Sequence, residues 1–299
     1  MTDFRDTLRG IVAMLLCCLF FIINDTIVKA IVGDLPLGQV LFIRSFIATV
    51  IVFVGVWKMG LLPKVLPQTS RYVVTRSFVE GISTVVYLGG LMHLPIANAS
   101  AIAQGAPLAV TAAGAIILGE AVGWRRWLSV VVGFVGILII VRPGPDGFNA
   151  WALLIVLSVI LVTIREISTR FVAPDTNSAV VTLVTQVFVT LACGALAATE
   201  VWHAMSLTEF GLVALAGLSC IFGVHFSVDA MRHGDISLVA QFRYSFIPFA
   251  IIMGWVFFGD VPDLITLFGI AVVVGSGIYI FYRERVRHQT LAASADPSV

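Results

Sequence analysis

Hydrophobic residues occur along the chain in long blocks that are separated by short polar segments. Ten blocks are mostly apolar over about 20 residues, the length that a helix needs to cross the hydrocarbon core of a bilayer. The strict alternation of an outer-membrane barrel is missing, and a backbone in lipid must satisfy its own hydrogen bonds, so the blocks predict helices. The pattern therefore predicts an all-α membrane protein with ten transmembrane helices, at 10–32, 38–57, 70–92, 96–118, 126–142, 150–171, 178–198, 208–230, 236–257 and 264–282.

The distribution of Lys and Arg between the spans predicts their orientation. If the N-terminus is inside, the outer flanks hold only Lys29 and Arg142, and the inner segments hold Arg5, Arg9, Lys58, Lys64, Arg71, Arg125, Arg126, Arg170, Arg232, Arg283, Arg285 and Arg287. Short cytoplasmic loops carry the excess of positive charge. We therefore expect a multi-pass protein of the bacterial inner membrane with both termini in the cytoplasm. The polar tail, residues 288–299, is expected to be disordered.

The second half of the chain repeats features of the first at an offset of about 140 residues. The matched pairs, in the same order in both halves, are Asp25 with Glu166, Lys29 with Arg170, His93 with His233, Gln104 with Gln241, Pro107 with Pro248 and Gly119 with Gly259. Each half holds five predicted helices, and an odd number gives the two halves opposite orientations. The predicted units are residues 1–143 and 144–287, as two inverted five-helix repeats, an arrangement typical of secondary transporters.

One segment carries a resemblance to a known family. The run LPIANASAIAQGAPLAVTAAGAIILGE at 94–120, with its small residues, Pro107 and the Gly119-Glu120 end, resembles the EamA repeat of the drug/metabolite transporter superfamily. The second copy, ISLVAQFRYSFIPFAIIMGWVFFGD at 236–260, departs from it by ending in Asp260. The resemblance implies ten helices and transport by alternating access. The YddG-type amino-acid exporters are a matching subgroup.

Composition narrows the function classes further. Only 12% of the residues are charged and the mean hydropathy is +1.04, whereas soluble domains carry about 25% charged residues. The net charge of +1 gives no reason to expect nucleic acid as a partner. The cysteines, all in apolar runs, are expected to be packing residues. The expected partners are a small-molecule substrate and the lipid bilayer; no cofactor and no metal is expected, and a monomer is adequate.

Charged residues inside apolar spans are costly and so indicate pairing, a water-filled cavity or a function. Three of them are predicted to lie in the outer third of the membrane and three in the inner third. We interpret these groups as gates that close alternately, and the alternative is that they are ion pairs that only join helices. The outer group is Asp25, Lys29 and Arg44, and the inner group is Glu166, Arg170 and Asp229.

Other polar residues are predicted to line a central cavity. Glu80 could meet a substrate ammonium group, and Arg243 or Gln241 could meet a carboxylate, so a zwitterionic solute is expected. For the third span, the alternative is that Arg76 and Glu80 form an ion pair without a role in binding. For the eighth span, the alternative is a structural hydrogen bond between His225 and Asp229. The predicted substrate-binding residues are Glu80, Tyr87, Gln104, His225, Gln241, Arg243 and Tyr244.

Prolines interrupt one span in each half. Pro107 and Pro248 remove a helix hydrogen bond and are predicted to bend the fourth and ninth helices toward the cavity. The alternative is that they are ordinary kinks without a function.

The predicted function is a secondary transporter that exports amino acids or similar small metabolites. The alternatives are transport of another class, such as a nucleotide sugar or a cationic drug, a passive channel, or a membrane enzyme. The usual catalytic motifs and the Walker A motif are missing from the sequence, which favours a protein that is not an enzyme.

Overall fold

The computed structural model describes residues 4–119, 123–142, 150–232 and 239–294, and within these ranges it contains helices and no strand. The predicted all-α class is confirmed. The predicted boundary between the halves, at 143/144, and the end of the predicted tail, 295–299, lie outside the described residues.

The helices follow the predicted blocks, with one addition and two interruptions. The addition is a short helix, α3. The first half contains α1 (Phe4–Ile31), α2 (Leu37–Lys58), α3 (Leu62–Gln68), α4 (Arg71–Leu91), α5 (Ile96–Ala103), α6 (Ala106–Ile117) and α7 (Trp124–Val141). The second half contains α8 (Ala150–Thr169), α9 (Ser178–Ala197), α10 (Leu207–Arg232), η1 (Ala240–Ser245), α12 (Phe246–Met253), η2 (Gly254–Phe258) and α13 (Leu264–Ser294).

Eight helical segments in the described part of the chain are long and apolar enough to cross a membrane. They correspond to α1, α2, α5 with α6, α7, α8, α9, α10, and the run from η1 to η2. α13 adds a shorter apolar stretch, Leu264–Ile280. Large apolar side chains such as Leu138, Trp255 and Phe268 are more than half exposed, as expected for surfaces that face lipid rather than water.

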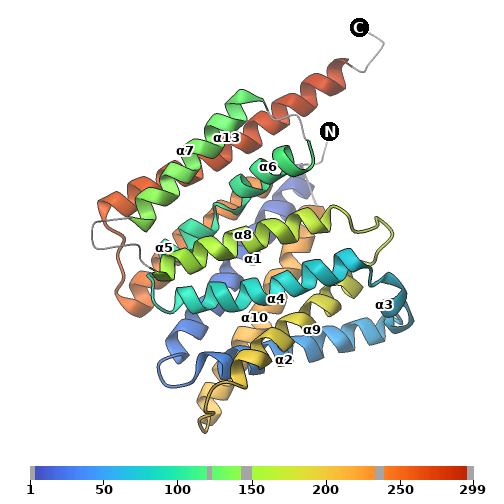
Figure 1. Ribbon diagram of the computed structural model, residues 1–299, viewed down its shortest axis with the longest axis vertical. Coiled ribbons are helices and arrows are strands. Elements are labelled where there is room, and N and C mark those ends of the chain that lie inside the picture. The colour runs from blue at the N-terminus through green and yellow to red at the C-terminus, as the bar shows by residue number, and fades with distance from the viewer. Residues whose placement is uncertain (1–3, 120–122, 143–149, 233–238, 295–299) are drawn as a thin grey trace.

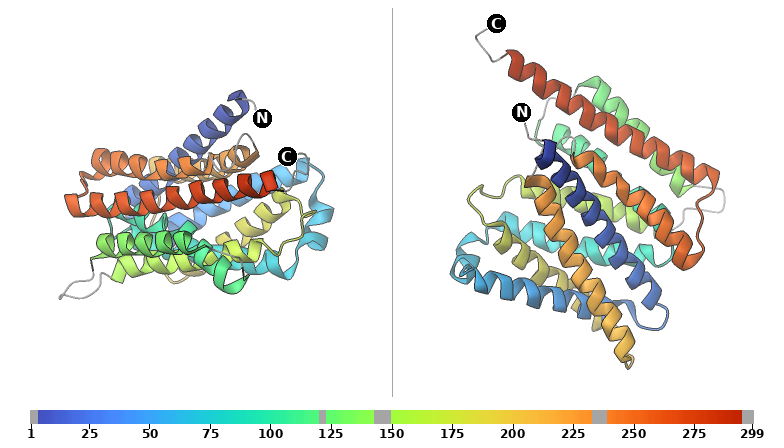
Figure 2. Two further views of the ribbon diagram at one scale, coloured as in Figure 1. Left: turned by 90° about the horizontal axis from the view of Figure 1, so that it is seen from above. Right: turned by 180° about the vertical axis from the view of Figure 1, so that it is seen from behind.

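The closest helix pairs join the first half of the chain to the second. α1 packs along α10, α4 along α8 and α9, α2 along α9, and α7 along α13 (Figures 1 and 2). α4 approaches its neighbours closely because it carries glycine at both contacts. A Cβ on Gly81 would lie 2.8 Å from the Phe188 carbonyl of α9, and one on Gly90 would lie 2.9 Å from the Trp151 carbonyl of α8. The polar residues of α4 are therefore held against two helices of the other half.

The predicted fourth and ninth spans are both discontinuous. The fourth breaks at Gln104 and Gly105 between α5 and α6, and the ninth begins as the 3-10 helix η1 before α12. A proline clashes with the carbonyl four residues before it and cannot donate to it. For Pro107 that residue is Ala103, where α5 ends, and for Pro248 it is Tyr244, in η1. Both interruptions therefore lie directly before a proline, and α5 packs against α12.

Candidate functional site

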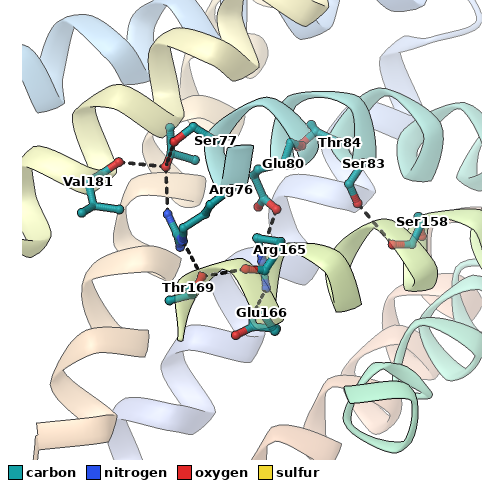
Figure 3. A network of polar contacts seen from close by, with 11 residues as sticks. Arg76, Ser77, Glu80, Ser83, Thr84, Ser158, Arg165, Glu166, Thr169 and Val181 are labelled. Atoms are coloured by element: carbon teal, nitrogen blue, oxygen red, sulfur yellow. Dashed lines mark hydrogen bonds and ion pairs between the residues drawn. The ribbon is translucent and has the colours of Figure 1, made fainter. Parts of the chain in front are cut away.

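A network of polar side chains joins α4 to α8 near the middle of α4 (Figure 3). Arg165 of α8 donates to Glu80 at 2.7 Å and also to its sequence neighbour Glu166. The side chains of Arg165 and Glu80 are only 17% and 25% exposed. One guanidinium thus pairs with two carboxylates in a mostly apolar setting, where charge-assisted hydrogen bonds are strong.

Arg76 extends the same network toward α9. Its Nε donates to the Thr169 hydroxyl at 2.8 Å and its Nη1 donates to the Thr185 hydroxyl at 2.9 Å. The expected alternative, an Arg76–Glu80 pair, is not the arrangement found, because Glu80 accepts from Arg165 instead. We call Arg76, Glu80, Arg165, Glu166, Thr169 and Thr185 the Arg165 network.

A second polar group joins α1, α2 and α4. Asn24 accepts from Arg44 at 2.7 Å and donates to Asp25 at 2.9 Å, so its amide bridges the cation and the carboxylate. Tyr87 of α4 donates to the other carboxylate oxygen of Asp25 at 3.0 Å. We call these four residues the Asn24 cluster. All three charged or amide side chains are almost fully buried, with 3% to 5% of each residue exposed.

Lys29, the third member of the predicted outer gate, has different partners. Its ammonium donates to the Leu94 carbonyl and lies 5.3 Å from the centre of the Phe258 ring. It therefore joins the end of α1 to the α4–α5 connection and to η2, one turn beyond the Asn24 cluster.

The two interrupted helices meet through a side chain. Gln104, at the end of α5, donates to the Arg243 carbonyl in η1 at 2.8 Å and is 6% exposed. Main-chain groups that helix breaks leave without partners need such bonds. The Arg243 side chain is exposed, Gln241 is half-buried, and both stand on η1. The predicted residues Gln104, Gln241 and Arg243 thus gather where the interruptions of the two halves meet.

Tyr244 is buried between η1 and α13. Its hydroxyl has no hydrogen-bond partner among the described residues, and it lies against Gly277, where a Cβ would overlap it. Glycine at that position of α13 makes room for the ring.

The residues of the predicted inner gate are divided between two places. Glu166 accepts from Arg165, as described above, whereas Asp229 of α10 accepts from Arg9 of α1 at 3.3 Å. Arg170 is exposed directly after the end of α8, and His225 is exposed one turn before Asp229. The Arg9–Asp229 bond joins helices 220 residues apart in sequence.

Two cavities lie away from the Arg165 network and the Asn24 cluster. One, of about 430 Å³, is formed by α1 and α10 beside Arg9 and Asp229. The other, of about 470 Å³, is lined by residues that include Asn98, Arg142, Asp260 and Asp263. At its edge Arg142 donates to Asp263, and this hydrogen bond holds the pKa of the Asp263 carboxyl well below its usual range. Both volumes are large enough for a small metabolite.

Among the described residues, no three His, Cys, Asp or Glu side chains are grouped as metal ligands would be. Sequence reasoning did not select Arg76, Arg165 or Asn24 as site residues, although each was visible as a polar residue within an apolar span. Their roles depend on partners such as Glu80, which is 85 residues from Arg165. The signal that could have identified Arg165 is its place directly beside Glu166, which puts two charges on adjacent faces of one helix.

The chain resembles known transporters over almost its whole length. Residues 8–142 match the EamA-like transporter family. The S-adenosylmethionine uptake transporter of Rickettsia prowazekii is 27% identical over 94% of this chain and 95% of its own length. The pseudopaline exporter of Pseudomonas aeruginosa is 27% identical over 89% and 93%. The riboflavin transporter of Rhizobium johnstonii is 28% identical over 72% and 71%.

A crystal structure of another protein covers 93% of this chain and 96% of its own chain with a TM-score of 0.65. At 17% identity that likeness shows the fold alone.

Proposed function

We propose that this chain, a multi-pass membrane protein of the EamA-like transporter family, moves amino acids or similar small zwitterionic metabolites across the bacterial inner membrane. The observation that carries the proposal is the Arg165 network, which places cations and carboxylates together inside the bundle, between helices of the two halves. Charged residues in such places mark substrate pathways in membrane transporters.

The helix pairing supports ten spans arranged as two inverted repeats. α4 and α13 supply the two spans beyond the eight apolar ones, because each packs along a spanning helix, α8 and α7 respectively. If the spans of the two halves correspond in chain order, α1 corresponds to α8 and α4 corresponds to α10. Exchanging the halves then turns the α1–α10 pair into α8–α4. The same exchange turns α4–α9 into α10–α2 and α6–α8 into α12–α1, and each of these pairs is in contact. A pseudo-two-fold axis between the halves accounts for this pattern.

The difference in exposure between the two ends supports alternating access. The Asn24 cluster, which the predicted topology puts in the outer third, is buried, with Asp25 at 5% and Arg44 at 4%. Glu166, the counterpart of Asp25 in the second half, has a side chain that is 41% exposed. Arg243 and Arg170 are exposed as well. These values fit a conformation that is closed outside and open inside. In the opposite conformation the two halves exchange these arrangements.

The chemistry of the Arg165 network supports a zwitterionic substrate. A substrate ammonium group can pair with Glu80, and a carboxylate can pair with a guanidinium in a two-bond geometry. S-adenosylmethionine, the solute of one relative, itself carries an α-amino-acid group. Riboflavin, the solute of another, does not, so the family's fold accommodates other solutes and the substrate class needs a direct test.

The arrangement of the chain ends supports both termini on the cytoplasmic side. α1 begins and α13 ends at the same end of the bundle (Figure 1), as an even number of spans requires. The loops on that side carry most of the Lys and Arg residues. For the direction of transport we propose export, as in the pseudopaline exporter.

Flux into liposomes tests the substrate class. Purified protein in liposomes is assayed with labelled L-methionine, L-phenylalanine, S-adenosylmethionine, riboflavin, a nucleotide sugar and a cationic dye. We expect saturable movement of at least one amino acid without chemical change. Flux of only riboflavin, the nucleotide sugar or the dye contradicts the proposal. In cells, overexpression should lower cytoplasmic amino acids and increase resistance to toxic analogues, whereas raised cytoplasmic levels would reverse the proposed direction.

A further inference from the structure

Arg76 is a half-buried cation whose hydrogen-bond acceptors are uncharged. The two acceptors are the hydroxyls of Thr169 on α8 and Thr185 on α9, at 2.8 and 2.9 Å. Each threonine donates its own hydrogen to a main-chain carbonyl, Thr169 to Arg165 at 2.7 Å and Thr185 to Val181 at 2.8 Å. Both hydroxyls can therefore only accept from Arg76, so they hold the guanidinium in place without neutralising it.

The carboxylates nearest to Arg76 are already engaged. Glu80, one turn along α4, pairs with Arg165 at 2.7 Å, and Glu166 pairs with the same guanidinium. Arg165 thus uses both carboxylates of the network, and the contacts in the described part of the chain leave Nη2 of Arg76 without an acceptor. A cation in a partly buried place that lacks a paired anion is costly, and a bound anion removes that cost.

We propose that Arg76 binds the carboxylate group of the transported solute. A guanidinium offers a planar set of donors that matches a carboxylate, and the two threonines fix its plane before the solute arrives. Glu80 lies about 6 Å along the same helix face, because it is four residues away. The ammonium group of an amino acid would then point toward Glu80 while its carboxylate stays on Arg76. This inference rests on the proposed function and names the residue that recognises the acidic end of the solute.

A pair of matched solutes separates recognition of the carboxylate from general loss of activity. Flux of L-methionine and of L-methioninamide, which lacks the carboxylate, is measured for the wild type and for Arg76→Gln in liposomes. We expect Arg76→Gln to raise the half-saturation concentration of methionine by roughly ten- to a hundredfold, the effect of losing a charge-assisted pair, and to leave methioninamide unchanged. Arg71→Gln, on an exposed arginine at the start of the same helix, is the matched control and should alter neither solute.

Arg76→Lys keeps the proposal testable if the glutamine variant does not insert. Lysine retains the charge but not the planar donors, so the half-saturation concentration of methionine should rise several-fold and that of methioninamide should not change. If either folded variant changes both solutes equally, or changes neither, Arg76 is only a structural residue and the inference is wrong. A wild-type protein that moves no amino acid instead contradicts the proposed function. The inference about Arg76, which rests on that function, is then rejected as well.

Discussion

At the scale of single residues, two tyrosines that look equivalent in the sequence have opposite environments. Both lie in apolar spans and both were expected to touch substrate. The Tyr87 hydroxyl donates to Asp25 at 3.0 Å, whereas the Tyr244 hydroxyl is buried without a partner among the described residues. A buried hydroxyl without a partner has lost its hydrogen bonds to water and gained none in return. The same substitution should therefore act differently at the two positions.

We predict that Tyr244→Phe leaves the free energy of unfolding of the detergent-solubilised protein unchanged or raises it by about 1 kcal/mol. Tyr87→Phe should lower it by about 1 to 2 kcal/mol, because the buried Asp25 carboxylate loses a donor. Thermal unfolding measured side by side distinguishes the two, and equal destabilisation would show that Tyr244 has a partner. A loss of flux in a stable Tyr244→Phe variant would support its predicted contact with substrate.

At the scale of helices, the Asn24 cluster ties together α1, α2 and α4, and the Arg165 network ties α8 to α4. α4 therefore contributes to both groups, with Tyr87 in one and Glu80 in the other. Releasing one group should free the helices at that end only. Removing a single charge would leave an opposite charge uncompensated, so a fair test neutralises one carboxylate and one cation of each predicted gate together.

We predict that Asp25→Asn with Arg44→Gln biases the transporter toward the outward-open conformation, and that Glu166→Gln with Arg170→Gln biases it toward the inward-open one. Single cysteines in the two vestibules, on a background without the native cysteines, are labelled with a membrane-impermeant thiol reagent from each side. Labelling should change in opposite directions in the two double variants. If it stays unchanged in variants that still transport, both groups are structural and the gates do not exist.

At the scale of the whole molecule, the contacts cross between the halves more than they stay within them. The pairs α1–α10, α2–α9, α4–α8 and α7–α13 each join one half to the other. The helices of one half therefore bury their apolar faces mainly against the other half. With five spans in each half, as proposed above, the halves would have opposite orientations and the two termini would lie on one side of the membrane.

We predict that reporter fusions at Arg9 and Arg287 both behave as cytoplasmic. The twelve Lys and Arg residues of the predicted inner segments, named above, favour this orientation. A fusion in the 199–207 loop, which carries no Lys or Arg, serves as the control and should report the outside. An external signal from only one terminus is incompatible with ten spans, and an external signal from both contradicts the predicted orientation.

The sequence by itself determined the class of the protein and the course of its helices, because the need to match apolar length to a bilayer acts on each segment separately. It also predicted bends at Pro107 and Pro248, since a proline acts on its own helix. Only the tertiary structure decided which polar residues meet. Glu80 pairs with Arg165 rather than with Arg76, and Asn24 stands between Asp25 and Arg44. Such pairs join residues distant in sequence, and their geometry depends on how closely the helices pack, which no local pattern specifies.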